Sequence, residues 1–453
     1  SGLSSSTGAV TAAFDGTGIF TGTIGNAAVT VGSGFTMTTT AAKATTETID
    51  GAGSVAITAL DQTLAADLSG ITATSVTAAF DNTGTFTGTI GSAVVTVATD
   101  ATLTTTAAKA TTETIDGAGN IAITALTTAN TDLSGITVSG TKTVAASDTL
   151  NATTDLGTFA VTVANGATLT ATAAQLTGLA ITGDGSVVVT DLDATLAADL
   201  SGITVTGTIT AEFDADGTFT GDLGTAAAVT VAGGVTMTTT AAIVSSNTII
   251  GDITLSDTAI SDAGALNTID TNTSGTVDAT AAISITGTAA ELITIGDADD
   301  AGTILAYTNS AGDEAYAAVF TGIADLAQFN AIDADTAGKL DFTDANAYLD
   351  LSVNDASDIN LANLSQADKL TKIDINNSEA NTISNVSAVN LIGVTGGSTT
   401  LTIDGDTNDF ISFTDSWTQT VNANGSGDTH YTYTSGSGTT YTIIDTDGGM
   451  SVI

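Results

Sequence analysis

Arginine, proline and cysteine are absent from this chain of 453 residues, and only six lysines face 49 acidic residues. The formal net charge of −43 leaves few cations for phosphate groups, which excludes nucleic-acid binding. The missing arginine also excludes a bidentate guanidinium clamp for a carboxylate or phosphate. Without cysteine there is no disulfide, thiolate metal site or cysteine nucleophile, and this absence suits a protein outside the cell.

Long apolar runs are missing as well, although the mean hydropathy is +0.33. The apolar residues are interleaved with Thr, and no stretch approaches the roughly 18 apolar residues that a transmembrane helix needs. Charged residues make up 12% of the chain, too few for a charge-rich disordered protein. Residues 1–13 lack the pattern of a signal peptide, and because the sequence begins at Ser1 we expect a processed chain or a fragment.

An internal repeat with a period of 66 residues runs through the first half of the chain. Segments 11–60 and 77–126 are nearly identical, and the block 38–53 recurs unchanged at 104–119. More diverged copies keep nearly the same spacing, which predicts an array of stacked units. Three columns of apolar residues mark equivalent positions: Met37, Leu103, Leu169 and Met237; Ile49, Ile115, Ile181 and Ile249; and Leu68, Leu133 and Leu200.

The repeat consists of short β-branched runs with a period of two, separated by Gly, Asn and Asp turns. Such short strands cannot bury a face alone, but equivalent strands from successive turns of the chain cover one another. Three turns of roughly 22 residues per repeat predict a parallel β-solenoid over residues 1–250, with about four repeats. The alternative is a string of small antiparallel sandwiches. Against it, no linker separates the copies, and aromatic residues, at 4%, are scarce for several small cores.

Residues 251–395 change the pattern and predict a diverged part of the solenoid with Asp-rich loops. Residues 266–280 align with residues 329–343, and each of these segments joins an Asp/Asn turn to a strand. Short helical insertions are expected at 289–292, 324–329 and 364–370.

These Asp loops are the candidate metal sites. Asp333, Asp335, Asp341 and Asp344 occupy positions 1, 3, 9 and 12 of an EF-hand-like loop with Gly at position 6, although positions 5 and 12 depart from the full pattern. Calcium takes six to eight oxygen ligands, and the large negative charge favours bound divalent cations. The alternative is a solvated Asx turn. Further calcium ligands are expected among Asp270, Asn272, Ser274, Asp278, Asp297, Asp299, Asp300, Asp404, Asp406, Asp409, Asp445 and Asp447.

Residues 396–453 hold the only tryptophan, Trp417, and the only histidine, His430. Two Thr/Tyr-rich segments follow, around Tyr431 and Tyr441, and their alternation predicts antiparallel strands. We expect a small C-terminal antiparallel β domain that caps the open end of the solenoid.

The C-terminal region resembles the C-termini of bacterial surface proteins exported by type I secretion, namely the repeats-in-toxin adhesins and S-layer proteins. The resemblance lies in the acidic turn before Trp417, the alternating Tyr strand, and the segments Ile443–Asp447 and Met450–Ile453. Residues 253–292 also look like repeats of bacterial surface-layer and adhesin-like proteins. The nonapeptide Gly-Gly-x-Gly-x-Asp repeat of that family is absent here, so the resemblance does not by itself imply calcium. The resemblance implies a location on the bacterial cell surface.

An enzyme is not expected. His430 lies in an aromatic strand, where cross-strand packing explains it, and Lys43 and Lys109 are repeat equivalents rather than a unique catalytic group. We expect an extracellular structural protein that binds copies of itself head to tail in an S-layer or filament, with calcium as its cofactor. The alternative is an adhesin stalk that binds a surface, a cell-surface glycan or ice.

Overall fold

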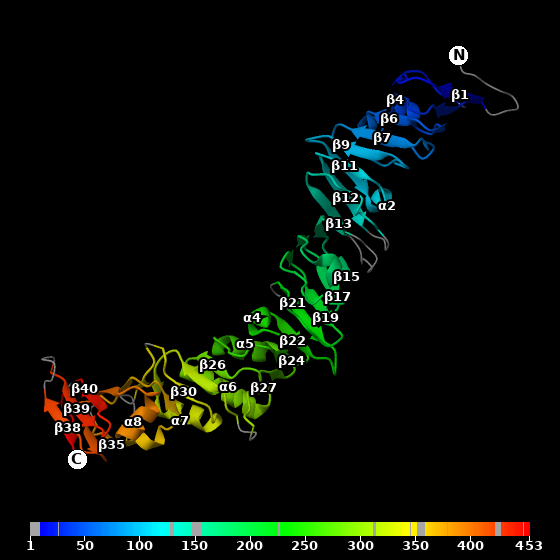
Figure 1. Ribbon diagram of the computed structural model, residues 1–453. Helices are drawn as coiled ribbons and strands as arrows, with labels where there is room; N and C mark the ends of the chain where they lie inside the picture. The colour runs from blue at the N-terminus through cyan, green and yellow to red at the C-terminus, as the bar shows by residue number, and fades with distance from the viewer. Residues whose placement is uncertain are drawn as a thin grey trace. The chain divides into compact units, whose positions relative to one another are not determined.

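The computed structural model describes residues 10–25, 27–126, 131–146, 156–224, 227–310, 314–344, 346–350, 358–377, 379–421, 427–446 and 448–453. The chain forms two compact units, residues 1–214 with 221–230 and residues 215–220 with 231–453. Short parallel strands dominate both units and helices are few, which confirms the expected all-β class in this coarse form (Figure 1).

Every strand pairing described within the first unit is parallel. One sheet contains β1 (Val10–Phe14), β3 (Ala27–Val31) and β5 (Ile49–Asp50). A second contains, in spatial order, β2 (Gly18–Ile19), β4 (Thr36–Thr40), β6 (Ser54–Thr58), β7 (Ser75–Phe80), β9 (Val94–Val97) and β11 (Ile115–Gly117). A third contains β8 (Gly84–Thr85), β10 (Thr102–Thr106), β12 (Asn120–Leu126), β13 (Lys142–Ala146), β14 (Ala160–Val163), β16 (Ile181–Gly183) and β18 (Ile203–Val205). A fourth contains β15 (Thr168–Thr172), β17 (Ser186–Thr190), β19 (Ile209–Phe213) and β21 (Ala227–Val231).

The register stacks like residues on like residues. Met37 of β4 pairs with Val55 of β6, which pairs in turn with Val76 of β7. Parallel neighbours cannot be joined by a tight hairpin, so the chain makes a longer excursion before it returns to the same sheet. Alternate side chains point inward, and most inward positions therefore lie against apolar residues of the neighbouring strands.

The three predicted apolar columns form part of the core. Their members are at most 1% exposed in every copy, from Met37 and Ile49 to Met237 and Ile249. Burying one such side chain contributes about 1.5–3 kcal/mol, so the columns supply much of the stability of each repeat.

Glycine at four equivalent positions lets neighbouring turns of the chain approach closely. Gly51, Gly117 and Gly183 have φ of 110°, 111° and 116°, and Gly251 has φ of 122°. A Cβ atom at Gly117 would overlap the carbonyl oxygen of Val97 on the preceding turn. A Cβ atom at any of the other three glycines would overlap the carbonyl oxygen of the equivalent Val in the same way. Only glycine combines this backbone conformation with this contact.

Short helices also recur in the repeats, although the sequence analysis did not foresee them. Each follows a Thr-rich strand, and the Lys43 and Lys109 side chains belong to the first two. In the strands before three of the four helices, a buried Thr hydroxyl donates a hydrogen bond to a carbonyl of the preceding turn, as Thr105 does to Phe86 at 3.0 Å. The helices are α1 (Ala41–Ala44), α2 (Ala107–Ala110), α3 (Ala173–Leu176) and α4 (Ala241–Val244), and a 3₁₀ turn, η1, covers Leu60–Gln62.

The second unit continues the parallel pattern in further sheets. One contains β20 (Gly217–Thr218), β22 (Met237–Thr239), β24 (Ile253–Leu255), β25 (Val277–Asp278) and β27 (Ile304–Leu305). Another contains β26 (Ser284–Gly287), β28 (Ala317–Phe320), β30 (Leu340–Asp341) and β33 (Ala367–Asp368). Strand β23 (Thr248–Ile250) also belongs to this part of the chain. A third sheet contains, in spatial order, β29 (Ala324–Asp325), β31 (Leu349–Asp350), β34 (Lys372–Asp374), β36 (Thr400–Asp404), β40 (Thr440–Asp445), β39 (Thr429–Thr434) and β38 (Thr418–Val421). A fourth contains β32 (Asp358–Asn360), β35 (Thr382–Val386), β37 (Phe410–Phe413) and β41 (Ser451–Val452).

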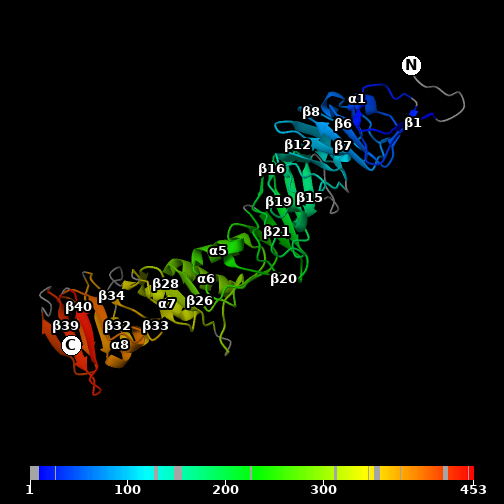
Figure 2. The same ribbon diagram turned by 45° about the horizontal axis from the view of Figure 1, so that its top comes forward.

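Longer helices distinguish the second unit. Helices α5 (Ala263–Asn272), α6 (Ala289–Ala301) and α7 (Leu326–Asp335) pack in succession, and α8 (Ala388–Val394) follows (Figure 2). Capping boxes begin α6 at Thr288 and α7 at Asp325, because the side chain and the backbone N–H exchange hydrogen bonds with the third helical residue. Two of the three predicted helical insertions are therefore confirmed. The third is wrong, because residues 361–363 form a 3₁₀ turn, η2 (Leu361–Asn363), and β33 follows.

The predicted antiparallel strands are present as β38, β39 and β40. They do not form a separate sheet, because β40 also pairs in parallel with β36. Trp417 stacks on Phe413 at 5.1 Å and lies 5.8 Å from Tyr433, so the aromatic residues pack across these strands. His430 lies in β39 opposite Thr420 and Ile444, among packed strands.

Candidate functional site

An acidic cluster in the second unit is the strongest candidate site. It consists of Asp297, Asp299 and Asp300 at the end of α6, Glu314, and Asp335 at the end of α7. The sequence analysis assigned Asp335 and the three α6 residues to different sites, and it did not single out Glu314. Packing of α6 against α7 brings their carboxyl ends into one region.

Local hydrogen bonds hold the parts of the acidic cluster. Gly302, with φ of 75°, ends α6, and the backbone N–H of Ala306 then donates to Asp299 at 2.6 Å. On the other side, the N–H of Ala337 donates to the carbonyl of Glu314 at 2.7 Å. This bond ties the turn after α7 to the backbone that carries Glu314.

Two members of the acidic cluster, Glu314 and Asp335, have raised pKa values. Desolvation, a hydrogen bond to the Asp299 carboxyl and the charges of neighbouring acids together raise the pKa of Glu314 to about 7. Desolvation and the charges of Asp300, Asp297 and Asp299 also raise the pKa of Asp335. Two carboxyl groups in contact cannot both be ionised without strong repulsion, so either a proton or a cation must lie between Glu314 and Asp299.

Tyr316 adds a buried hydroxyl to the same region. Its side chain is fully buried, and its hydroxyl group has no hydrogen-bond partner. Burial, together with the charges of Asp335, Glu314 and Asp299, raises the pKa of Tyr316. A buried polar group without a partner is costly, which makes this hydroxyl unusual in a packed protein.

Gly296 leaves room for the carboxylate of Asp335. A Cβ atom at this helical position would overlap the Oδ2 and Cγ atoms of Asp335. The Asp335 carboxylate therefore lies directly against the α6 backbone, one residue before Asp297.

The predicted EF-hand-like loop has a different structure. Asp333 and Asp335 belong to the last turn of α7, so a helix replaces the beginning of the expected loop. Asp341 lies in β30, where it accepts hydrogen bonds from Thr343 and forms an ion pair with Lys369 at 2.8 Å. Asp344 accepts a bond from the N–H of Asn346. Asp341 and Asp344 therefore have separate local partners, and the four residues do not form one loop.

The aligned segment around residue 270 behaves similarly. Asp270 and Asn272 lie in α5, and one buried carboxylate oxygen of Asp270 has no hydrogen-bond partner. Ser274 follows the helix, and its hydroxyl accepts a bond from the N–H of Gly251. The Asp278 carboxylate, in β25, accepts two bonds from Thr280.

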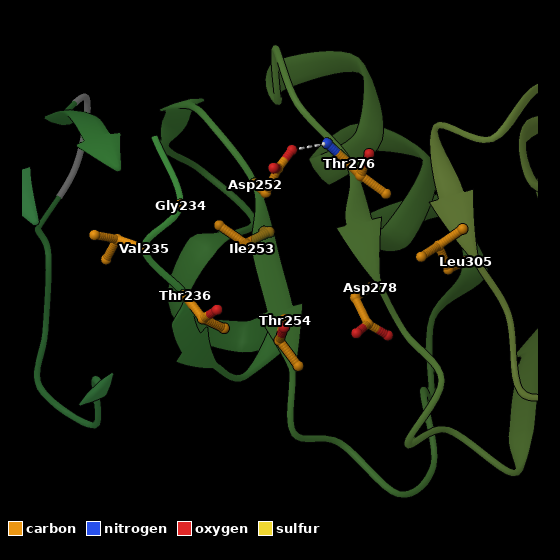
Figure 3. Close-up of a pocket in the computed structure, with 9 residues that line it drawn as sticks. All are labelled: Gly234, Val235, Thr236, Asp252, Ile253, Thr254, Thr276, Asp278 and Leu305. Carbon is orange, nitrogen blue, oxygen red and sulfur yellow. Dashed lines mark hydrogen bonds between the residues drawn. The ribbon is translucent and has the colours of Figure 1, made fainter. Parts of the chain in front are cut away.

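Asp278 also lines an open groove of about 370 Å³ on the outer side of β24 and β25. The groove contains a second acid, Asp252, which accepts a bond from the N–H of Thr276 at 2.7 Å. The two carboxylates point in different directions and do not form one site (Figure 3). Thr and aliphatic side chains complete the lining.

The C-terminal acidic residues are held by protein donors. Asp404 forms an ion pair with Lys372 at 2.8 Å. Desolvation acts to raise the pKa of Asp404, but the hydrogen bonds from Lys372 and Thr446 outweigh it, so the pKa is lowered. Asp409 is fully buried and accepts bonds from the backbone N–H and side-chain amide of Asn381. Asp406 accepts a hydrogen bond from the backbone N–H of Asn408. Asp445 is buried and accepts hydrogen bonds from the backbone N–H groups of Gly448 and Met450. Asp447 lies outside the described residues.

Within the described ranges, no three His, Asp or Glu side chains stand close enough together to hold a metal ion as they are. In that same part of the chain, none of the helices is long and apolar enough to cross a membrane. Comparisons with family models, curated proteins and solved structures found no match.

Proposed function

We propose that this protein is an extracellular structural protein of a bacterial cell surface, a parallel β-solenoid that binds copies of itself head to tail in an S-layer or filament. The stacked parallel strands support the solenoid. The resemblance of residues 253–292 and of the C-terminal segment to surface-layer proteins supports the location.

The observation that carries the proposal is the difference between β1 and its repeat equivalent, β7. Val76, Ala78 and Phe80 in β7 are at most 3% exposed, because β6 and β9 cover this strand on its two edges. The equivalent residues of β1, by contrast, are half-buried. Among the described residues, β1 pairs with β3 alone, and no described strand covers its other edge. An open edge with apolar side chains favours pairing with another strand.

Among the described strands, β41 pairs with β37 alone, so no described strand covers its other edge either. Val452 is 50% exposed and Ile453 is 64% exposed. Contact between β41 of one copy and β1 of the next would be heterologous, and such contacts propagate into filaments or lattices. Calcium completes the proposal, since acidic copies of net charge −43 repel one another unless cations intervene.

Sedimentation and negative-stain microscopy of the purified chain, with calcium and with chelator, test the proposal. We expect polymers in calcium. Replacing half-buried Ala12 by Glu at the open edge should abolish them, whereas Thr96→Glu at an exposed position of internal strand β9 should leave them intact. A monomer at high concentration in both conditions would overturn the proposal and favour an adhesin stalk.

A further inference from the structure

We propose that the acidic cluster and the hydroxyl of Tyr316 form a calcium site assembled from α6, Glu314 and the end of α7. This inference rests on the calcium requirement of the proposed function and assigns it to particular residues. The site differs from the EF-hand-like loop, because it takes only Asp335 from that segment.

The Glu314 and Asp299 carboxyl groups are in hydrogen-bond contact. Two acids in hydrogen-bond contact provide four oxygen atoms in one place, and all of them favour a hard cation. The described ion pairs of the chain place Lys369 and Lys372 on Asp341, Asp374 and Asp404. None of these ion pairs includes an acid of the acidic cluster, so they supply it with no counter-charge.

The hydroxyl of Tyr316 has no hydrogen-bond partner. Its side chain is fully buried, yet the charges that act on it come from Asp335, Glu314 and Asp299. A hydroxyl oxygen in this position has lone pairs available for a cation, either directly or through a bound water. A bound ion would thus satisfy a polar group that the protein leaves unsatisfied.

Gly296 provides space for the Asp335 carboxylate beside α6. The absence of a side chain there lets the Asp335 carboxylate lie against α6, at the same end of the helix as the other acids. No three of these carboxylates converge as they stand, and a bound cation would offset the repulsion between them. Calcium tolerates flexible geometry with six to eight oxygens, so rotation of these side chains is enough to complete its shell together with water.

Titration of the full-length chain with calcium in a calorimeter tests the assignment, with terbium as a luminescent substitute. We expect Asp335→Asn and Glu314→Gln each to weaken calcium binding about tenfold or more. Asp344→Asn, in the loop that the sequence favoured, should bind calcium with unchanged affinity. Terbium bound beside Tyr316 should emit on tyrosine excitation, and Tyr316→Phe should remove most of this emission while terbium still binds.

Unchanged calcium affinity in both cluster variants, or tyrosine-excited emission that persists in Tyr316→Phe, would overturn the assignment. Melting curves in chelator check folding, because each cluster variant removes a like charge and should melt no lower than the parent. The luminescence of Tyr316→Phe decides the question even if a carboxylate variant fails to fold. Sedimentation of the parent reports assembly separately, so loss of this site and loss of the proposed polymer are distinguishable.

Discussion

Two groups of acidic residues, one in each unit, differ in what surrounds their carboxylates. In the first unit, Asp67, Asp132 and Asp199 recur at turns, and each accepts hydrogen bonds from the hydroxyl and backbone N–H of the Ser two residues later. The Ser hydroxyl is the largest cause that lowers the pKa of each of these aspartates. In the second unit, Glu314 and Asp335 are desolvated among other acids, and their pKa values are raised. The number of donors facing a carboxylate, rather than the residue type, decides whether its charge stabilises the fold.

The largest expected effect is on the repeated backbone contact of the first unit. Gly117→Ala should lower the free energy of unfolding by about 3 kcal/mol, because the methyl group overlaps the carbonyl of Val97 and the φ of 111° disfavours alanine. Hydrogen exchange resolved by segment measures this in the unit concerned. Gly166→Ala is the matched control. Its φ is 78° with open space around it, so about 1 kcal/mol is expected, and equal losses would contradict the close approach.

The pH dependence separates the two units. With chelator present, Glu314 should stabilise the second unit fully below its ordinary pKa of 4.5, and this contribution should be lost as the pH rises through about 7, because its folded pKa is raised. The three turn aspartates of the first unit should act in the opposite direction. Their contribution is present above 3.8 and is lost as the pH falls through their lowered folded values.

Hydrogen exchange in each unit across this pH range measures the difference. Glu314→Gln should remove most of the loss between pH 4.5 and about 7 in the second unit and leave the first unit unchanged. An identical pH profile in parent and variant would show that Glu314 does not carry the effect.

A smaller effect is expected at Gly296. Alanine in place of glycine inside a helix normally stabilises by about 1 kcal/mol. We expect no gain for Gly296→Ala, because its Cβ must displace the Asp335 carboxylate. Gly393→Ala in α8 has open space and should show the ordinary gain. Equal gains in the two variants, measured by chemical denaturation, would show that Asp335 moves aside freely.

The smallest effect is expected at the repeated turn. Ser134→Ala removes the hydroxyl that donates to Asp132, so the pKa of Asp132 should rise toward its ordinary value of 3.8. Titration followed by nuclear magnetic resonance detects the change, while melting at neutral pH stays the same because the group is exposed. Asp199, which keeps its own Ser201, provides the internal reference.

Helix ends were only partly predictable. The starts of α6 and α7 follow from local signals, Thr288 with Glu291 and Asp325 with Gln328, in which the partners are three residues apart. The end of α7 was missed, because Asp333 and Asp335 matched an EF-hand spacing that a helix also accommodates. The four-residue helices α1 to α4 were missed because they are too short for a helical period to appear.

The repeat period and the buried columns were determined by the sequence itself, because inward burial follows from a local alternation that each copy restates. The parallel direction of the strands was inferred from the same repetition. The meeting of Asp299, Glu314 and Asp335 was decided by tertiary structure alone. These residues lie in three different segments of the chain, and the packing of α6 on α7 brings their carboxyl groups near one another. Spacing along the sequence predicts only which residues are neighbours within one turn or loop.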